Sequence, residues 1–162
     1  LALAAEPTLI VADEPTTALD VSIQAQIITL LKRLCHERGA AVMLITHDMG
    51  VIAETCDRVA VLYAGRVAEI GPVHEVIHAP AHPYTGGLMA AIPDMTIERE
   101  RLNQIDGAMP RLNAIPAGCA YNPRCPRAFD RCTTERPDLI EAGSTRAACW
   151  LHDATQGARV AA

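Results

Sequence analysis

The stretch LIVADEPTTALD, residues 9–20, joins a short apolar run to two adjacent carboxylates and a proline. The run from Leu9 to Ala12 is typical of a strand buried on both faces of a parallel sheet. Asp13 and Glu14 follow directly, although like charges repel each other. Because neighbouring residues at a strand end point in different directions, one carboxylate can face a metal ion and the other a water molecule. That arrangement fits phosphoryl transfer, in which Mg²⁺ neutralises phosphate oxygens and a second carboxylate activates the attacking water.

A strand–helix–strand unit continues from this stretch. Apolar residues recur at helical spacing between a possible N-cap at Asp20 or Ser22 and a closing Gly39. A second apolar run, residues 42–45, then leads into His47. Such crossover units are right-handed, and open α/β sheets bind ligands at the carboxyl ends of their strands. The acid pair and the histidine therefore fall where chemistry is expected.

The sequence predicts a hairpin and short helices after this unit. A helix is expected over residues 49–56, followed by two β-rich runs around the turn at residues 64–65, which would add antiparallel strands to the sheet. Pro72 is well placed as the first residue of another helix, and a further helix is expected around residues 88–92. The first part of the chain is therefore predicted to be an α/β fold with parallel strands and an antiparallel hairpin.

The character of the sequence changes near Ile92. Beyond it the periodicity is lost, prolines recur, and four of the six cysteines are found. We therefore expect an α/β core over residues 1–92 and a small irregular, cysteine-rich extension over residues 93–162. Cys35 and Cys56 lie in apolar helical surroundings and are interpreted as ordinary buried thiols.

Composition argues against several classes of function. The 162 residues carry a formal net charge of −5 and no basic run interleaved with aromatic residues, so no nucleic-acid partner is expected. No apolar stretch reaches the about 18 residues of a membrane-spanning helix, and no secretory signal opens the chain. The chain starts at Leu1, inside a helix-like LALAAEP, so we expect a further segment upstream.

Two motifs resemble those of the ATP-binding cassette (ABC) ATPases. LIVADEPTTALD resembles their Walker B motif and D-loop, and LITHD, residues 44–48, resembles their switch-histidine segment. The resemblance implies that Asp13 holds Mg²⁺, that Glu14 is the general base and that His47 senses the γ-phosphate of ATP. Asp20 would lie in the loop that contacts the opposite ATPase subunit of a dimer. Alone, an acid pair is more often solvated and a histidine more often structural, but their combination favours the ATPase interpretation.

Other motifs of these ATPases are absent from the sequence. Nothing resembles the phosphate loop G-x-x-x-x-G-K-[ST], the Walker A motif, and the one lysine, Lys32, falls inside a predicted helix. The Q-loop glutamine and an LSGGQ-like signature are missing too. The resemblance therefore covers only the C-terminal part of a P-loop NTPase core, and we expect the chain to be inactive alone.

The remainder of the chain narrows the family. HPYTGGLMAAIP, residues 82–93, and IPAGCAYNPRCPRAFDRC, residues 115–132, resemble the C-terminal extension of the ATPase subunits of dipeptide, oligopeptide and nickel importers. The resemblance implies a peripheral subunit at the cytoplasmic face of the cell membrane that hydrolyses ATP to power peptide uptake. Its partners would be a second ATPase subunit, two membrane permease subunits and an extracytoplasmic peptide-binding protein. The alternative is a metal-binding interaction module on an ATPase remnant with no activity of its own.

Four cysteines of the extension form a candidate metal site: Cys119, Cys125, Cys132 and Cys149. Disulfides are disfavoured in the reducing cytosol. Structural zinc ligands usually come in pairs about two to four residues apart, and no such pair occurs here. An iron–sulfur cluster tolerates wider spacing, and the family resemblance points to a [4Fe–4S] centre. Zinc and unligated thiols remain alternatives, and His152 is a candidate substitute ligand.

The remaining histidines and aromatic residues carry weaker signals. His74, His78 and His82 form a loose cluster that could suggest a metal site. Because His74 and His78 share a short predicted helix, we interpret them instead as residues of its exposed face. Tyr84 and Trp150 are expected to pack within the extension, which has few other large side chains.

Overall fold

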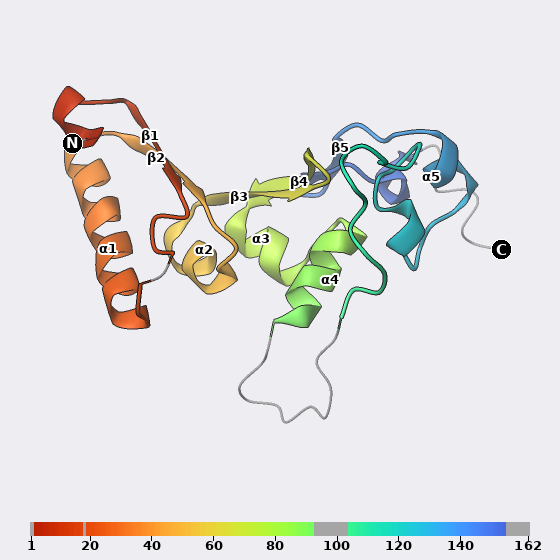
Figure 1. The fold of residues 1–162 in the computed structure, drawn as a ribbon. Coiled ribbons are helices and arrows are strands. Elements are labelled where there is room, and N and C mark those ends of the chain that lie inside the picture. The colour runs from red at the N-terminus through yellow and green to blue at the C-terminus, as the bar shows by residue number, and fades with distance from the viewer. Residues whose placement is uncertain (1, 18, 93–103, 155–162) are drawn as a thin grey trace. The chain divides into compact units, whose positions relative to one another are not determined.

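The computed structural model describes residues 2–17, 19–92 and 104–154 (Figure 1). The chain forms two compact units, Leu1–Cys56 (unit 1) and Asp57–Ala162 (unit 2). Residues 93–103 and 155–162 of the predicted extension lie outside the described residues, as does Ala18 of the predicted D-loop.

Unit 1 is built around a strand–helix–strand crossover. Its elements are η1 (Ala2–Ala5), β1 (Leu9–Asp13), α1 (Val21–Arg38), β2 (Ala41–Ile45) and α2 (Met49–Thr55). The two strands pair in parallel, from Leu9 opposite Ala41 to Asp13 opposite Ile45. The predicted crossover is therefore confirmed, and both strands end at the same edge.

The ends of α1 are fixed by local chemistry. The Asp20 carboxylate accepts the backbone N–H of Ile23 at 2.9 Å and caps the first turn. Gly39 ends the helix with φ 64°, a left-handed conformation that glycine adopts without steric cost. Of the two predicted caps, Asp20 is the one used, and the predicted helix end is confirmed.

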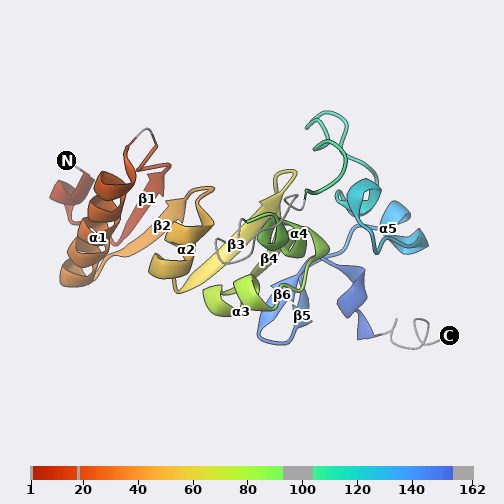
Figure 2. The same ribbon diagram turned by 90° about the horizontal axis from the view of Figure 1, so that it is seen from below.

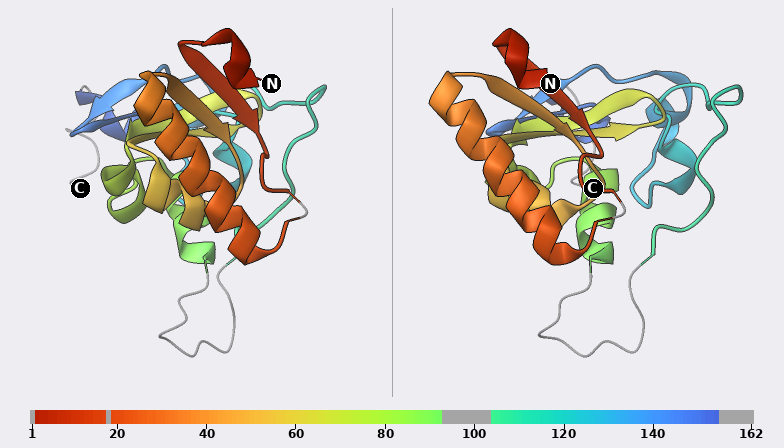
Figure 3. Two further views of the ribbon diagram at one scale, coloured as in Figure 1. Left: turned by 90° about the vertical axis from the view of Figure 1, so that its left-hand side faces the viewer. Right: turned by 60° about the vertical axis from the view of Figure 1, so that its left-hand side comes forward.

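The strand pair of unit 1 has one covered and one open face. Helix α1 runs along one face (Figure 3), and the buried apolar residues of this unit are Ile28, Cys35 and Ile52. On the other face, Val11 and Met43 are register partners and are 58% and 53% exposed. The prediction that the first strand is buried on both faces is therefore wrong for the described residues, because only one face has a helix against it.

Unit 2 contains a four-stranded antiparallel sheet in the order β3-β4-β6-β5 (Figure 2). Its elements are β3 (Arg58–Tyr63), β4 (Arg66–Pro72), α3 (Val73–His78), α4 (Pro83–Ala91), η2 (Asn122–Arg124), α5 (Asp130–Thr134), β5 (Ile140–Ala142), β6 (Thr145–Ala147) and η3 (Trp150–His152). The turn between β3 and β4 has positive φ at Ala64 and Gly65, the conformation that suits a tight hairpin. The predicted hairpin is confirmed.

The partners of this hairpin differ from the prediction. It was expected to extend the parallel sheet, but β3 and β4 lie in a separate sheet, because the second edge of β4 pairs with β6. The extension is therefore not irregular throughout, since Thr145–Ala147 completes a sheet begun by the hairpin. The boundary near Ile92 stays a prediction, because the segment that follows it lies outside the described residues.

Two helix starts also differ from the prediction. Pro72 is the N-cap of α3 rather than its first residue. Helix α4 already begins at Pro83, because the His82 ring accepts the Tyr84 N–H at 3.0 Å and caps it. The glycines at 86 and 87 weaken the helical signal, but a β-carbon at Gly87 would collide with the side chain of Ile105.

The core of unit 2 is closed and aromatic. Its buried apolar residues are Val61, Tyr63, Ala68, Val76, Tyr84 and Tyr121. The three tyrosine rings lie edge-on or tilted, with centroids 4.6 to 5.4 Å apart. The fully buried Glu69 carboxylate accepts the backbone N–H groups of Ala81 and His82, each at 2.9 Å. The predicted packing role of Tyr84 is confirmed.

Candidate functional site

The acid pair and the histidine meet at the carboxyl ends of β1 and β2. The His47 Nδ1–H donates to Glu14 Oε1 at 2.8 Å, and the Thr17 hydroxyl donates to Glu14 Oε2 at 3.1 Å. The Glu14 backbone N–H donates to the Ile45 carbonyl at 2.8 Å, which continues the ladder one step beyond Asp13. Parallel pairing thus brings together two residues that are 33 positions apart in the sequence.

The backbone at Glu14 is strained. Its φ of 45° lies in the left-handed region, which is uncommon for residues other than glycine and costs about 1 kcal/mol or more. Such outliers cluster at functional sites, where the surrounding structure holds them in place. Here the left-handed turn ends the strand at Asp13 and directs Glu14 to His47.

The Glu14–His47 contact makes an ion pair. The hydrogen bond from His47 lowers the pKa of Glu14, and the same bond raises the pKa of His47. The His47 side chain is 87% exposed, so solvent can reach it freely. The pair therefore offers an ionised carboxylate beside a readily protonated imidazole.

Sequence reasoning assigned no role to two residues that support this site, Asp48 and Gln24. The Asp48 Oδ1 accepts the N–H groups of Gly50 and Val51 at 2.9 and 3.1 Å and caps α2. Its other oxygen accepts the side-chain N–H of Gln24 in α1 at 2.8 Å. An aspartate before a short helix is a local capping signal. Gln24 has no local signal, because its partner lies 24 residues away.

The four cysteines of the predicted metal site line one small pocket in unit 2, which we call the cysteine pocket. The residues around it are His82, Pro83, Cys119, Tyr121, Asn122, Cys125, Arg127, Cys132, Cys149, Trp150 and Leu151. All six cysteines of the chain, each within the described ranges, are free thiols. The structure therefore brings together the four residues that sequence reasoning grouped.

Hydrogen bonds to backbone carbonyl groups hold the residues of the cysteine pocket together. The Cys119 N–H donates to the Cys132 carbonyl at 2.9 Å, and the Asn122 side chain donates to the Cys119 carbonyl at 2.7 Å. At Gly118, with φ 69°, a β-carbon would overlap the Cys132 carbonyl oxygen. The close approach of these two segments therefore requires glycine at this position.

The cysteine pocket favours neutral thiols. Burial raises the pKa of Cys119 and Cys125, and it raises the pKa of Cys149 to about 11. The neighbouring thiols add to each shift, because thiolates repel one another. A bound cation would offset this repulsion, and four sulfur donors suit soft metals. Even so, no group of three or more His, Cys, Asp or Glu side chains in the described part of the chain is arranged to hold a metal ion.

The histidines are engaged in other contacts. His82 is buried, which lowers its pKa to about 4 and keeps the ring neutral. The His152 Nε2–H donates to the Ala81 carbonyl at 2.9 Å, so this nitrogen is occupied by the backbone. His74 and His78 stack with ring centroids 4.3 Å apart on the exposed side of α3. This position agrees with their interpretation as residues of an exposed helix face.

Comparison with known proteins identifies the family. Residues 68–132, from β4 to Cys132, match the family model described as the C-terminal region of oligopeptide/dipeptide transporters. The chain is 46% identical over 154 residues to the oligopeptide transport ATP-binding protein AppD of Bacillus subtilis (strain 168), covering 94% of the chain. It is 50% identical over 139 residues to the dipeptide transport ATP-binding protein DppD of Escherichia coli (strain K12), covering 86% of the chain. The chain belongs to the family of oligopeptide and dipeptide transport ATP-binding proteins.

The family match has a defined extent. The chain spans about half the length of these relatives, 47% of AppD and 42% of DppD. The matched C-terminal region includes Cys119, Cys125 and Cys132, whereas Cys149 lies beyond it. Within the described ranges, no helix has the length and apolar character needed to cross a bilayer.

The other two predicted site residues lie at the same edge of unit 1 as the ion pair. Asp13 is exposed at the end of β1, opposite Ile45 in register. Asp20 is exposed where it caps α1. The Mg²⁺ role of Asp13 and the dimer-contact role of Asp20 stay predictions for this member of the family.

Proposed function

We propose that this chain supplies the water-activating part of an ATP-hydrolysing site that powers uptake of dipeptides or oligopeptides. The observation that carries the proposal is the Glu14–His47 hydrogen bond of 2.8 Å at the carboxyl ends of two parallel strands. Ligands of open α/β sheets bind at these ends. The names of the relatives, which are transport ATP-binding proteins, support the transported class.

In this mechanism Glu14 is the general base. Its carboxylate takes a proton from the attacking water, and Thr17 holds the second carboxylate oxygen. Asp13 would hold Mg²⁺, because carboxylate oxygens are the ligands that this ion prefers. When bound, Mg²⁺ supplies charge that neutralises the phosphate oxygens.

His47 links phosphate binding to the strength of the base. While it donates to Glu14, it lowers the pKa of that carboxyl and weakens it as a base. When His47 turns to a γ-phosphate oxygen, this hydrogen bond is released and the basicity of Glu14 rises. The base is therefore strongest when substrate is present.

The test of this function is Glu14→Gln in a complete ATP-binding subunit that contains this sequence. The amide keeps the shape of the side chain but cannot take the proton, so hydrolysis should fall by about 100-fold or more while ATP binding is retained. Glu54→Gln, an exposed change on α2, is the matched control and should leave turnover unchanged. Unchanged turnover in Glu14→Gln would contradict the assignment.

The proposal also covers the assembly in which the chain works. A second ATPase subunit would contact the loop at Asp20, and two membrane permease subunits and an extracytoplasmic peptide-binding protein would complete the importer. The chain would then lie at the cytoplasmic face of the cell membrane. We expect residues 1–162 alone to bind ATP weakly or not at all, because affinity in this architecture rests on a phosphate loop and these residues contain no such motif. Micromolar binding by calorimetry would contradict this expectation.

A second function is proposed for the cysteine pocket, which we infer binds a [4Fe–4S] cluster, with zinc as the alternative. Four thiols lining one pocket support it, although no group in the described residues is arranged for a metal ion. Prepared without oxygen, the chain should absorb near 400 nm and carry about four irons. Cys132→Ser should remove the colour, whereas the control Cys56→Ser should not. Zinc without colour would favour the zinc alternative, and a metal-free, ordered pocket would contradict both.

A further inference from the structure

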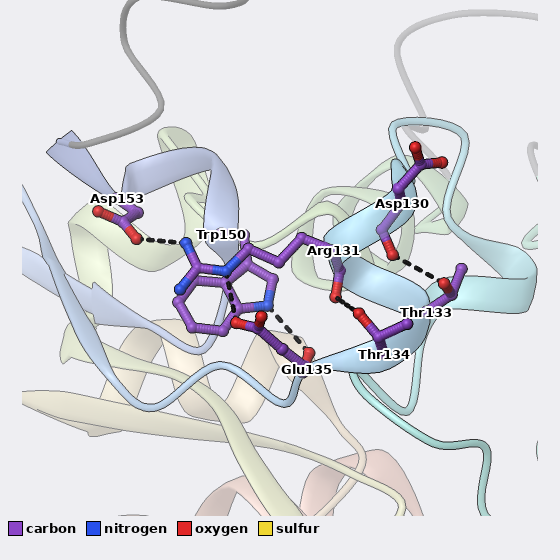
Figure 4. A network of polar contacts seen from close by, with 7 residues as sticks. All are labelled: Asp130, Arg131, Thr133, Thr134, Glu135, Trp150 and Asp153. Carbon is purple, nitrogen blue, oxygen red and sulfur yellow. Dashed lines mark hydrogen bonds and ion pairs between the residues drawn. The ribbon is translucent and has the colours of Figure 1, made fainter.

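Arg131 does not line the cysteine pocket, but it stacks on Trp150, which does (Figure 4). Arg131, in α5, immediately precedes Cys132. Its guanidinium carbon lies 3.5 Å from the centre of the Trp150 ring, and Trp150 immediately follows Cys149. The two residues that stack are therefore the neighbours of two pocket cysteines.

The stacked Arg131 also forms two ion pairs. Arg131 Nε donates to Glu135 Oε2 at 2.7 Å, and Arg131 Nη1 donates to Asp153 Oδ2 at 2.7 Å. The Trp150 indole N–H donates to the Glu135 carbonyl at 3.0 Å. Glu135 follows α5 and Asp153 follows η3. The Arg131–Glu135 ion pair therefore lies within the α5 segment, and the other contacts join this segment to the C-terminal segment.

The stack and its ion pairs depend on the planar guanidinium group of arginine. A planar guanidinium can stack on an indole while its N–H groups reach two carboxylates in its plane, which an ammonium group cannot do. The side chains of Arg131 and Asp153 are 29% and 19% exposed, so water competes only partly for their ion pair. The Arg131–Asp153 ion pair should therefore contribute more to stability than a fully exposed surface pair does.

Backbone hydrogen bonds also join segments around the pocket. Cys119 is tied to Cys132 by the hydrogen bond described above, and Ala148, which precedes Cys149, donates to the Ala68 carbonyl of β4 at 2.8 Å. The side-chain contacts of Arg131 add a direct link between the segments of Cys132 and Cys149.

We propose that Arg131 is a positioning residue that holds the segments of Cys132 and Cys149 together at the cysteine pocket before any metal binds. The Arg131–Trp150 stack and the Arg131–Asp153 pair join the two cysteine-bearing segments through protein contacts, so the placement of these segments does not depend on a bound metal. The proposal rests on the metal-binding function proposed for the four cysteines. It also predicts an effect on the pocket thiols that needs no metal.

The first experiment uses the metal-free chain. In Arg131→Ala, Cys132 and Cys149 should react with iodoacetamide about tenfold faster than in the original chain, the factor expected when one partly buried stack and its ion pairs are lost. Labelling is followed residue by residue by mass spectrometry. Trp150 is the only tryptophan, so its fluorescence reports loss of the stack. Arg146→Ala, an exposed change on β6, is the matched control and should match the original chain.

The second experiment measures metal retention after anaerobic loading with iron and sulfide. Arg131→Ala should lose its absorbance near 400 nm to a chelator about tenfold faster than the original chain. Arg131→Lys should lie between the two, because it keeps the charge but not the planar stack. A purely structural role would instead lower the melting temperature of the chain without this ordering.

The outcomes separate the two proposals. If the original chain binds neither iron nor zinc but Arg131→Ala still exposes the two thiols, the metal-binding function fails and the positioning role stands. If Arg131→Ala matches Arg146→Ala in labelling and in metal loss, the positioning role is overturned. Should Arg131→Ala fail to fold, Asp153→Asn removes one ion pair and must change both rates in the same direction for the proposal to stand.

Discussion

The two units bury their apolar residues to different extents. In unit 1 the open face of the strand pair leaves Leu9, Val11, Met43 and Ile45 between 45% and 58% exposed. In unit 2, Glu69, Val76 and Thr85 are fully buried. A strand pair with one helix layer covers one face, whereas four strands packed with helices and a cysteine-bearing segment enclose a core. The Glu14–His47 site therefore lies in the unit with more exposed apolar side chains, and the cysteine pocket lies in the unit with a closed apolar core.

The largest difference is expected between matched valines of the two units. Val76→Ala should lower the free energy of unfolding of unit 2 by about 2–3 kcal/mol, because it removes fully buried methyl groups and leaves a cavity. Val11→Ala should change stability by less than about 0.5 kcal/mol, because the side chain is 58% exposed. Urea unfolding followed by Trp150 fluorescence for unit 2, and by hydrogen exchange for unit 1, measures both. Equal effects would remove the distinction between the units.

The buried carboxylate of unit 2 should give the next largest effect. Glu69→Gln places an amide N–H against a backbone N–H of Ala81 or His82, and this should cost about 1–3 kcal/mol of unfolding free energy. Glu141→Gln, an exposed change on β5, is its control. The same urea titration measures both variants, and a neutral Glu69→Gln would show that the carboxylate is dispensable.

The link between α1 and α2 should matter less. Gln24→Ala removes the donor to Asp48 and should lower the stability of unit 1 by about 1 kcal/mol. Gln26→Ala is a matched change on an exposed position of the same helix. Faster hydrogen exchange in α2 of Gln24→Ala, and not of Gln26→Ala, would confirm the link. Identical exchange in both variants would contradict it.

The smallest effect is the pH dependence of the ion pair. The pKa of His47 is raised, so the ion pair is lost as the pH rises through the pKa of His47. The pKa of Glu14 is lowered, so the ion pair is lost as the pH falls through the pKa of Glu14. The pair is therefore intact between the two. By NMR titration, Glu14→Gln should return the pKa of His47 toward its ordinary value. An unchanged His47 titration would show that the two groups do not interact.

Some of this architecture follows from local sequence signals. The caps at Asp20 and Gly39, the hairpin turn and the order of the first elements depend on residues close together in the chain, so they were predictable. The meeting of Glu14 and His47 was predictable for a different reason. Parallel strands in a crossover end at one edge, and both residues follow apolar runs.

Other features depend on partners that local patterns do not reveal. The pairing of β4 with β6 joins Glu69 to Ala147, and a three-residue strand carries almost no periodic signal. The glycines in α4 weaken its helical signal, although close packing against Ile105 requires Gly87. The Arg131–Trp150 stack joins residues in two separate short elements, so neither sequence neighbourhood predicts it.

The most direct test of the proposed mechanism is a double-mutant cycle on ATP hydrolysis in a complete subunit that contains this sequence. Glu14→Gln, His47→Ala and the double variant are compared with the original at saturating ATP. In the proposed mechanism His47 acts on hydrolysis through the basicity of Glu14, to which it is hydrogen-bonded before phosphate binds. Its removal should therefore add little once Glu14→Gln has removed the base, so the double variant should be about as slow as Glu14→Gln alone, with ATP affinity retained in all three. If the two losses instead multiply, Glu14 and His47 act independently and the mechanism is contradicted.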